Sequence, residues 1–443
     1  MSPISPISQS VDLIIKNASE LLTLSTSSKE ESGLGIIRNG TIAAKRGRIL
    51  WVGGTHELPK EFVLDWEGQE IDATGKVVMP GLIDSHTHLV FAGSREHEFE
   101  QRIQGLSYLE IAERGGGILS TVEATRIASF DELRSLGRKR LDRMLSKGVT
   151  TIEAKSGYGL SFEGELKILE VTKSLQESHP VDIAPTFLGA HTIPKEFRDD
   201  RDRYVHLITK EMIPRVAEEG LAEFCDVFCE EKAFRLEESR KILETGKRYG
   251  LIPKIHADQL SPGGGAELAA EIGAFSADHL EYVSPAGIEK MAEKGVTAVL
   301  LPGVSFFLSM KKFPPAREMI EKGVSIALAT DLNPGSSMTE SLPLIMTMGC
   351  TLYRMTPKEV IQATTIHAAK SMGREKAIGS LEVGKQADLA VLDIPNYRYL
   401  PYHFGVDHVE IVVKKGKVVY KRIADCGLRL REPSGSERLR NAE

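Results

Sequence analysis

The stretch PGLIDSHTH, residues 80–88, gives the clearest indication of how this chain folds. A Pro-Gly pair opens it, a short apolar run follows, and His86 and His88 stand two residues apart at its end. Side chains two apart on a strand project to the same side, so both imidazoles face one space. Neutral imidazole nitrogen is a good ligand for Zn and Fe. An isolated His-x-His pair is more often a hydrogen-bonded or surface pair, so its meaning depends on the segments around it.

Seven further apolar segments follow this stretch, separated by sequence of helical character. They are rich in Val, Ile, Leu, Ala and Phe with little alternation, which is typical of strands buried on both faces of a parallel sheet. Between the first two, Leu133, Leu141 and Met144 fall on one helical stripe, and Gly148 follows at a stop position. Eight strand-then-helix units close a (β/α)8, or TIM, barrel, which is the α/β fold that we expect. The eight expected strands cover residues 82–88, 149–155, 182–191, 223–229, 252–258, 274–279, 297–302 and 325–331.

Both ends of the chain have a different pattern. Residues 11–79 and 387–430 hold short apolar runs between Gly, Asn and charged turns, which predicts small antiparallel strand sets. Neither end is long enough for a good core alone, so we expect one composite β-sandwich domain beside a barrel at 80–386. Residues 1–10 are expected to form a flexible start and residues 431–443 a tail.

Composition excludes several classes of protein. With 443 residues, 41% hydrophobic and 27% charged, the chain is ordinary for a globular protein and unlike a disordered one. No apolar run is long enough to span a membrane. The net charge of −6 and the lack of a basic patch argue against a nucleic-acid partner. The start of the chain does not have the pattern of a secretory signal. Reduced thiols and a cytoplasmic location are expected, because the cysteines are few and scattered: Cys225, Cys229, Cys350 and Cys426.

The polar residues at the strand ends predict a metal site. Functional residues of a (β/α)8 barrel gather at the C-terminal ends of its strands. The chain has only 12 histidines, yet five of them end expected strands, and an aspartate ends the eighth. His256 and Asp331 would complete a His3Asp ligand set with the first-strand pair. The strand-end residues are His86 and His88 on the first strand, His191 on the third, His256 on the fifth, His279 on the sixth and Asp331 on the eighth.

The motifs resemble the amidohydrolase superfamily of metal-dependent hydrolases, both at residues 80–88 and at 379–389. More narrowly, they are similar to its imidazolonepropionase family. The resemblance implies one Zn or Fe ion per chain, held by the His3Asp set. It further implies that a metal-bound hydroxide attacks the ring carbonyl of 4-imidazolone-5-propanoate, giving N-formimidoyl-L-glutamate in histidine degradation, and that the enzyme is a homodimer. The segments that carry the narrower resemblance are 91–95, 115–118, 153–159, 190–191, 256–259 and 330–336.

The same resemblance assigns roles to the other residues. His279 would polarise the carbonyl or position the nucleophile, and Asp331 would accept the water proton and pass it to the leaving nitrogen. Arg95 would bind the propionate through its planar fork. Some family members carry glutamate at the position of Gln259. An amide is not basic near neutrality, so Gln259 would hydrogen-bond the ring rather than act as a base. The expected substrate contacts are Arg95, Tyr158, His191, Gln259, Asn333, Gly335 and Ser336.

Other interpretations stay open at this point. A heteroaromatic-ring deaminase would use the same metal set, and a non-catalytic scaffold protein would be expected to have lost ligands. A bridging carbamylated lysine is expected on the fourth strand, whereas Lys155 ends the second, which argues against a binuclear site. Glu230 and Glu231 are expected to be surface carboxylates. The Gly115-Gly116-Gly117 run is expected to form a mobile loop near the site.

Overall fold

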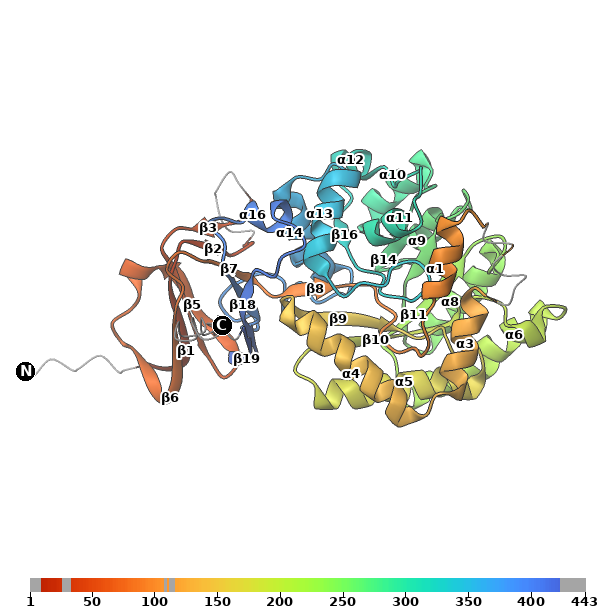
Figure 1. Cartoon of the computed structure of the whole chain (residues 1–443), viewed down its shortest axis with the longest axis horizontal. Coiled ribbons are helices and arrows are strands. Elements are labelled where there is room, and N and C mark those ends of the chain that lie inside the picture. Colours follow the sequence, from red (N-terminus) through yellow and green to blue (C-terminus); the bar gives the residue numbers. More distant parts are fainter. Residues whose placement is uncertain (1–8, 26–32, 107–109, 111–115, 423–443) are drawn as a thin grey trace, which may run out of the picture.

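The computed structural model describes residues 9–25, 33–106, 110 and 116–422. A barrel ringed by helices forms the larger part, and a smaller part made of β-sheet lies beside it (Figure 1). Some of the expectations concern residues outside these ranges: the tail at 431–443, most of the start at 1–10, Gly115 and Cys426. No helix in the described ranges combines the length and the apolar character needed to cross a membrane.

The barrel contains the eight expected strands in sequence order, each pairing with the next in parallel, so the predicted fold class is confirmed. The fifth expected strand is split into two short pieces, and both pair with the fourth strand. The barrel strands are β8 (Leu82–Asp84), β9 (Val149–Lys155), β10 (Asp182–Ala190), β11 (Phe224–Cys229), β12 (Ile252–Pro253), β13 (Ile255–Ala257), β14 (Ser276–His279), β15 (Thr297–Leu300) and β16 (Ile326–Leu328).

Residues beyond the ends of β8 and β16 bring the first and last strands together. Thr87 pairs in parallel with Leu332. The Asp331 N–H donates to the His86 carbonyl at 3.0 Å, and the His88 N–H donates to the Leu332 carbonyl at 3.0 Å. These backbone bonds place the histidines of the first strand beside the aspartate of the eighth.

Helices cover the outside of the barrel (Figure 1). The predicted amphipathic stripe lies on α4, where Leu133, Leu141 and Met144 are buried. Ser129 and Glu132 form a capping box at its start, and Gly148 follows its end with φ = 90°. Within the described ranges the α-helices are α1 (Glu96–Ile103), α3 (Ile118–Ile127), α4 (Phe130–Ser146), α5 (Phe162–Ser178), α6 (Arg201–Leu207), α7 (Ile213–Glu218), α8 (Leu236–Arg248), α9 (Gly265–Ile272), α10 (Pro285–Lys294), α11 (Pro302–Phe307), α12 (Ala316–Glu321), α13 (Leu342–Leu352), α14 (Pro357–Ala363), α15 (Ile366–Lys370) and α16 (Tyr399–Tyr402). There are also short 3-10 turns at Thr55–Glu57 and Lys195–Phe197 and a π-helix at Ile208–Met212.

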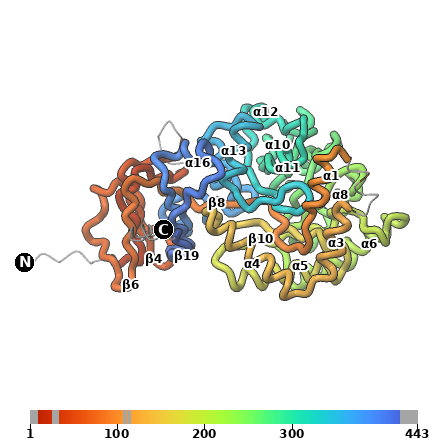
Figure 2. The backbone as a smooth tube through the Cα atoms, in the orientation of Figure 1, coloured from red at the N-terminus to blue at the C-terminus, as the bar shows by residue number. Residues whose placement is uncertain are grey.

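The smaller part is built from both ends of the chain, as expected. Figure 2 shows the red start and the blue end of the chain side by side there, and β17 pairs with β7. Two sheets, ordered β5-β4-β1-β6 and β19-β18-β17-β7-β2-β3, share one buried apolar cluster that includes Ile15, Ile42, Val391 and Val413. The strands are β1 (Gln9–Ala18), β2 (Glu20–Leu22), β3 (Ile36–Ile37), β4 (Gly40–Lys45), β5 (Arg48–Gly54), β6 (Phe62–Asp72), β7 (Val77–Pro80), β17 (Leu389–Leu392), β18 (Val409–Lys414) and β19 (Lys417–Lys421).

The expectation of purely antiparallel sets at the chain ends is wrong for two pairs. β6 runs parallel to β1, and β7 runs parallel to β2. Parallel neighbouring strands need a long crossover connection between them. The chain provides one in each case, because β2 to β5 come between β1 and β6, and β3 to β6 come between β2 and β7. Gly81 then links β7 to β8, where an added Cβ would lie 2.3 Å from the Thr150 side chain. The domain limits at residues 79–80 and 386–387 stay predictions.

Candidate active site

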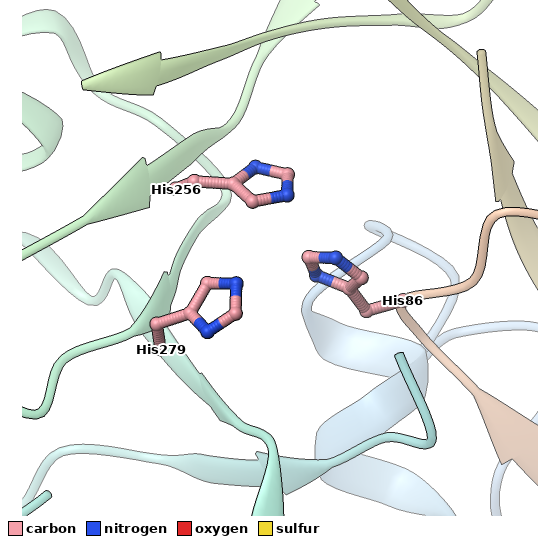
Figure 3. A group of neighbouring side chains, drawn as sticks. All are labelled: His86, His256 and His279. Carbon is pink, nitrogen blue, oxygen red and sulfur yellow. The ribbon is translucent and has the colours of Figure 1, made fainter. Parts of the chain in front are cut away.

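Five polar side chains converge at the C-terminal end of the barrel. Figure 3 shows His256 and His279 on neighbouring strands and His86 on the segment that follows β8, with the three rings turned toward one another. Their ring centroids lie 4.6 Å apart for His86 and His256, and 5.3 Å apart for His256 and His279. Asp331 Oδ1 lies 3.4 Å from His86 Nε2 and 3.5 Å from His88 Nε2. These distances bring together the four predicted metal ligands, His86, His88, His256 and Asp331, and the predicted catalytic residue His279. All five side chains are buried.

Several buried atoms of this cluster have no hydrogen-bond partner among the described residues. They are His86 Nε2, His256 Nε2, His279 Nδ1 and Asp331 Oδ1. A buried polar atom without a partner costs free energy, so such a group of atoms calls for a ligand. Donor atoms of His86, His256 and His279 lie within 4.8 Å of one another, and so do those of His86, His88 and Asp331.

The protonation states suit a metal ion. Burial lowers the pKa of His86, His88 and His279 well below the ordinary histidine value, so these rings are neutral. Burial also raises the pKa of Asp331 to about 7 in the absence of a cation, and His256 opposes this only in part. Neutral imidazoles beside one carboxylate form a nitrogen and oxygen donor set of the kind that binds Zn or Fe.

Buried charged side chains contact the histidines of the cluster, and these contacts were not predicted from the sequence. Asp278 Oδ2 lies 2.6 Å from His86 Nδ1, and Asp226 Oδ2 lies 3.0 Å from His256 Nδ1. Lys155 Nζ contacts Asp226 Oδ2 at 2.7 Å, Glu153 at 2.9 Å and Asp278 Oδ2 at 3.4 Å. Burial opposes the charge of Lys155, but Asp226 and Glu153 outweigh it and raise the pKa of the ammonium. Lys155 therefore acts as a buried counter-ion on the second barrel strand.

A cavity of about 450 Å³ opens onto the cluster, and every predicted substrate-contact residue lines it. His88, His256, His279 and Asp331 also reach its wall. A larger hollow of about 780 Å³ lies on the sheet part around Trp66 and Lys417, away from the histidines. The predicted contacts in the smaller cavity are Arg95, Tyr158, His191, Gln259, Asn333, Gly335 and Ser336, and the further residues are Glu98, Arg102, Ile118, Phe228, Leu260 and Leu308.

One wall of the cavity is aromatic. The His191 ring stacks on His88 with centroids 5.0 Å apart and an interplanar angle of 7°, and Tyr158 meets both rings edge-on. Burial, followed by the proximity of His256, lowers the pKa of His191 to about 4, so this ring is neutral. Its Nδ1 lies 3.0 Å from the Gly157 carbonyl oxygen. This wall suits a flat heterocycle.

A tight loop after β16 forms another part of the cavity wall. Asn333 Oδ1 accepts hydrogen bonds from the Gly335 N–H at 2.8 Å and the Ser336 N–H at 2.9 Å. Asn333 Nδ2 donates to the Asp331 carbonyl at 2.8 Å. The Asn333 side chain therefore shapes the loop that presents Gly335 and Ser336 to the cavity.

Arg95 stands at the start of α1 and is held by a carboxylate. Its Nε and Nη2 donate to Glu98 Oε2 at 2.9 Å and 2.8 Å. Glu98 Oε1 accepts from the Gly117 N–H at 2.9 Å, so Glu98 also anchors the start of α3. Because this pairing occupies one edge of the guanidinium, a ligand carboxylate would meet the Nη1 side, which faces Gly335.

The expectation for Glu230 is wrong. Its side chain is buried and accepts hydrogen bonds from the Leu260 N–H at 2.7 Å and from Ser261 Oγ at 2.7 Å. The backbone N–H groups of the loop after β13 have no partner in a strand, and the carboxylate of Glu230 at the end of β11 accepts from them instead. Glu230 therefore fixes the loop that holds Gln259. Glu231 is exposed, as expected, and Cys225 and Cys229 are buried free thiols of the core.

Comparisons with known proteins agree with this geometry. The amidohydrolase family profile matches residues 77–419. A protein named imidazolonepropionase from Geobacillus thermodenitrificans is 55% identical over 421 residues, which is 94% of this chain and 99% of the relative. A protein of the same name from Alkaliphilus oremlandii is 50% identical over 93% of this chain and 99% of its own length. Among solved structures, a zinc-bound adenosine deaminase from Xanthomonas campestris superposes with a TM-score of 0.69 at 17% identity, covering 93% of both chains, and shows the fold alone.

Proposed function

This chain belongs to the amidohydrolase family and, within it, to the imidazolonepropionases, and from that premise we propose how its buried cluster works. The reaction is hydrolysis of the imidazolone ring of 4-imidazolone-5-propanoate to N-formimidoyl-L-glutamate in histidine degradation. The observation that carries the proposal is the set of unpartnered buried atoms on His86, His256, His279 and Asp331. The last three of these residues also line the cavity.

The metal centre is assigned to one ion per chain, Zn or Fe, with His86, His88, His256 and Asp331 as ligands. Such an ion supplies Lewis acidity and makes water nucleophilic near neutral pH. Asp278 accepts from Nδ1 of His86, and the carboxylate of Asp226 lies 3.0 Å from Nδ1 of His256, so the two carboxylates help to orient these rings. The other ring nitrogens, Nε2 of His86 and Nε2 of His256, have no hydrogen-bond partner among the described residues.

The remaining residues position the substrate and move its protons. The imidazolone ring lies against the wall formed by His191 and Tyr158, with Gln259 hydrogen-bonded to it. Asp331 accepts the proton of the attacking water and delivers it to the ring nitrogen as the carbonyl C–N bond breaks. His279, which also lines the cavity, donates a hydrogen bond to the carbonyl oxygen or positions the attacking water. Arg95 binds the propionate beside Gly335 and Ser336.

A metal-reconstitution experiment tests this assignment. Chelated enzyme should be inactive and should regain full activity with one equivalent of Zn or Fe per chain, the better metal identifying the native one. The double variant His86→Ala/His88→Ala should retain well below one equivalent of metal. An exposed histidine on α6 provides the control, since His206→Ala should bind metal like the wild type. Full metal content in the double variant would contradict the ligand set.

The rival reaction, deamination of a heteroaromatic ring, would release ammonia directly and is distinguished by assaying for it. A homodimer and a cytoplasmic location stay predictions, to be checked by sedimentation and by cell fractionation.

A further inference from the structure

Arg102 lines the cavity from the same helix, α1, that begins beside Arg95. Its Nη1 donates to the Gly335 carbonyl at 3.2 Å, and its guanidinium carbon lies 5.0 Å from the centre of the Phe307 ring. The side chain is therefore held on two sides at the cavity wall. In the part of the chain that the structure describes, no carboxylate lies within ion-pair distance of Arg102, whereas Arg95 has Glu98.

The charges at this wall do not balance without a ligand. Glu98 neutralises Arg95, and burial keeps this pair away from water. A substrate carboxylate that faced only this neutral pair would lose its hydration without gaining a net positive partner. Arg102 adds one positive charge, which equals the charge that a propionate brings.

The two guanidinium groups flank one residue. An added Cβ on Gly335 would lie 2.3 Å from Arg95 Nη1, while the Gly335 carbonyl accepts from Arg102. Burial, together with the neighbouring charge of Arg95, lowers the pKa of Arg102. Glu98 offsets this effect of Arg95 on Arg102 only in part, so an anion bound beside both guanidinium groups would stabilise the charge of Arg102.

We propose that Arg102 is a specificity-determining residue of this site: it supplies the net positive charge that the Arg95–Glu98 pair lacks and binds the substrate carboxylate together with Arg95. This inference rests on the proposed function, because it assumes that a propionate-bearing imidazolone occupies the cavity. It assigns Arg95 the orientation of the carboxylate and Arg102 the discrimination between charged and neutral side chains.

The test measures binding of two unreactive probes to the metal-loaded enzyme by calorimetry. Imidazole-4-propionate carries the carboxylate, and 4-propylimidazole lacks it. Arg102→Met should weaken binding of imidazole-4-propionate about 10- to 100-fold, as expected for loss of a charge-assisted hydrogen bond. Binding of 4-propylimidazole should change less than about twofold. Arg102→Lys should recover part of the loss, because it restores the charge without the planar fork.

Arg198→Met is the control, since it removes an exposed positive charge outside the substrate cavity. It should bind both probes like the wild type. Equal weakening of both probes by Arg102→Met would show a merely structural role and overturn the inference, and so would undiminished binding of imidazole-4-propionate. Failure of the proposed function is distinguishable, because the wild type would then neither bind imidazole-4-propionate nor hydrolyse the imidazolone.

Discussion

The Nδ1 atom of His86 lies 2.6 Å from Oδ2 of Asp278, and both side chains are fully buried. This contact fixes the ring so that its other nitrogen, Nε2, faces Asp331 Oδ1 at 3.4 Å. On the neighbouring ring, Nδ1 of His256 lies 3.0 Å from Oδ2 of Asp226, close enough for an electrostatic contact. Lys155 lies between the two carboxylates and contacts both. The barrel interior thus aims two of the proposed metal ligands before any ion binds.

Replacement of Asp278 tests this support. Asp278→Asn keeps the shape of the side chain but replaces the carboxylate with a neutral amide, so it should lower metal affinity about 10- to 100-fold. Competition with a chromophoric chelator measures the affinity. Asp142→Asn removes a carboxylate from the His179 pair far along the sequence from the ligands and should leave metal affinity unchanged. An unaltered metal affinity in Asp278→Asn would show that the ring of His86 does not need this partner.

Loss of Arg95 should reduce substrate recognition. Arg95→Met should cost about 2–5 kcal/mol in kcat/KM, because it removes one member of a desolvated charge pair. Arg95→Lys should not restore the full value, since lysine has no planar fork. Steady-state kinetics with 4-imidazolone-5-propanoate provide the measurement, and Arg134→Met, on the exposed face of α4, is the control. If kcat/KM were unchanged in Arg95→Met, the carboxylate would bind elsewhere.

Gln259 should bind the ring without exchanging protons. Gln259→Ala should raise KM, whereas Gln259→Glu should keep substantial activity, because the amide is not basic near neutrality and proton transfer is assigned to Asp331 and His279. Asp331→Asn should lose both metal affinity and turnover. A pH–rate profile of the wild type beside Gln259→Glu checks this division of roles. A glutamate variant faster by orders of magnitude than a nearly inactive wild type would refute it.

Asp182 should stabilise the contact between the barrel and the sheet part. It begins β10 and accepts from Lys414 at 2.8 Å and Lys415 at 2.7 Å. Burial raises its pKa, but Lys414, helped by Lys415 and Gln386, outweighs burial and lowers the pKa from 3.8 to about 2. Because the folded-state pKa is depressed, the stabilisation is present above pH 4 and is lost as the pH falls toward 2.

Asp182→Asn should therefore cost about 1–2 kcal/mol of unfolding free energy at pH 6, allowing for solvent screening. Urea unfolding of both proteins from pH 6 down to pH 2 measures the difference, which should shrink through the acid range. A constant difference across that range would assign the effect to packing and not to charge.

The convergence of the proposed metal ligands could be predicted because these residues end strands. His86, His256, His279 and Asp331 each stand where a buried strand stops, and the barrel topology alone brings such ends together. The substrate-contact residues were predicted from the family resemblance, and all of them line the cavity.

The supporting charges could not be assigned from sequence. Asp226, Asp278 and Lys155 each stand within a buried strand, and a charge there signals a buried partner. The partners come from different strands, however, so only the three-dimensional register shows which ones meet. Glu230 was misjudged for the same reason, because the backbone donors that it satisfies belong to a loop 30 residues further along the chain.

Product analysis tests the central claim most directly. Purified, metal-loaded enzyme is incubated with 4-imidazolone-5-propanoate, and the product is identified by mass spectrometry while ammonia is assayed in parallel. Ring hydrolysis predicts a single product heavier than the substrate by one water, N-formimidoyl-L-glutamate, with no ammonia formed in step with it. Unchanged substrate, or ammonia released in step with substrate loss, would contradict the assignment of this site to imidazolone ring opening.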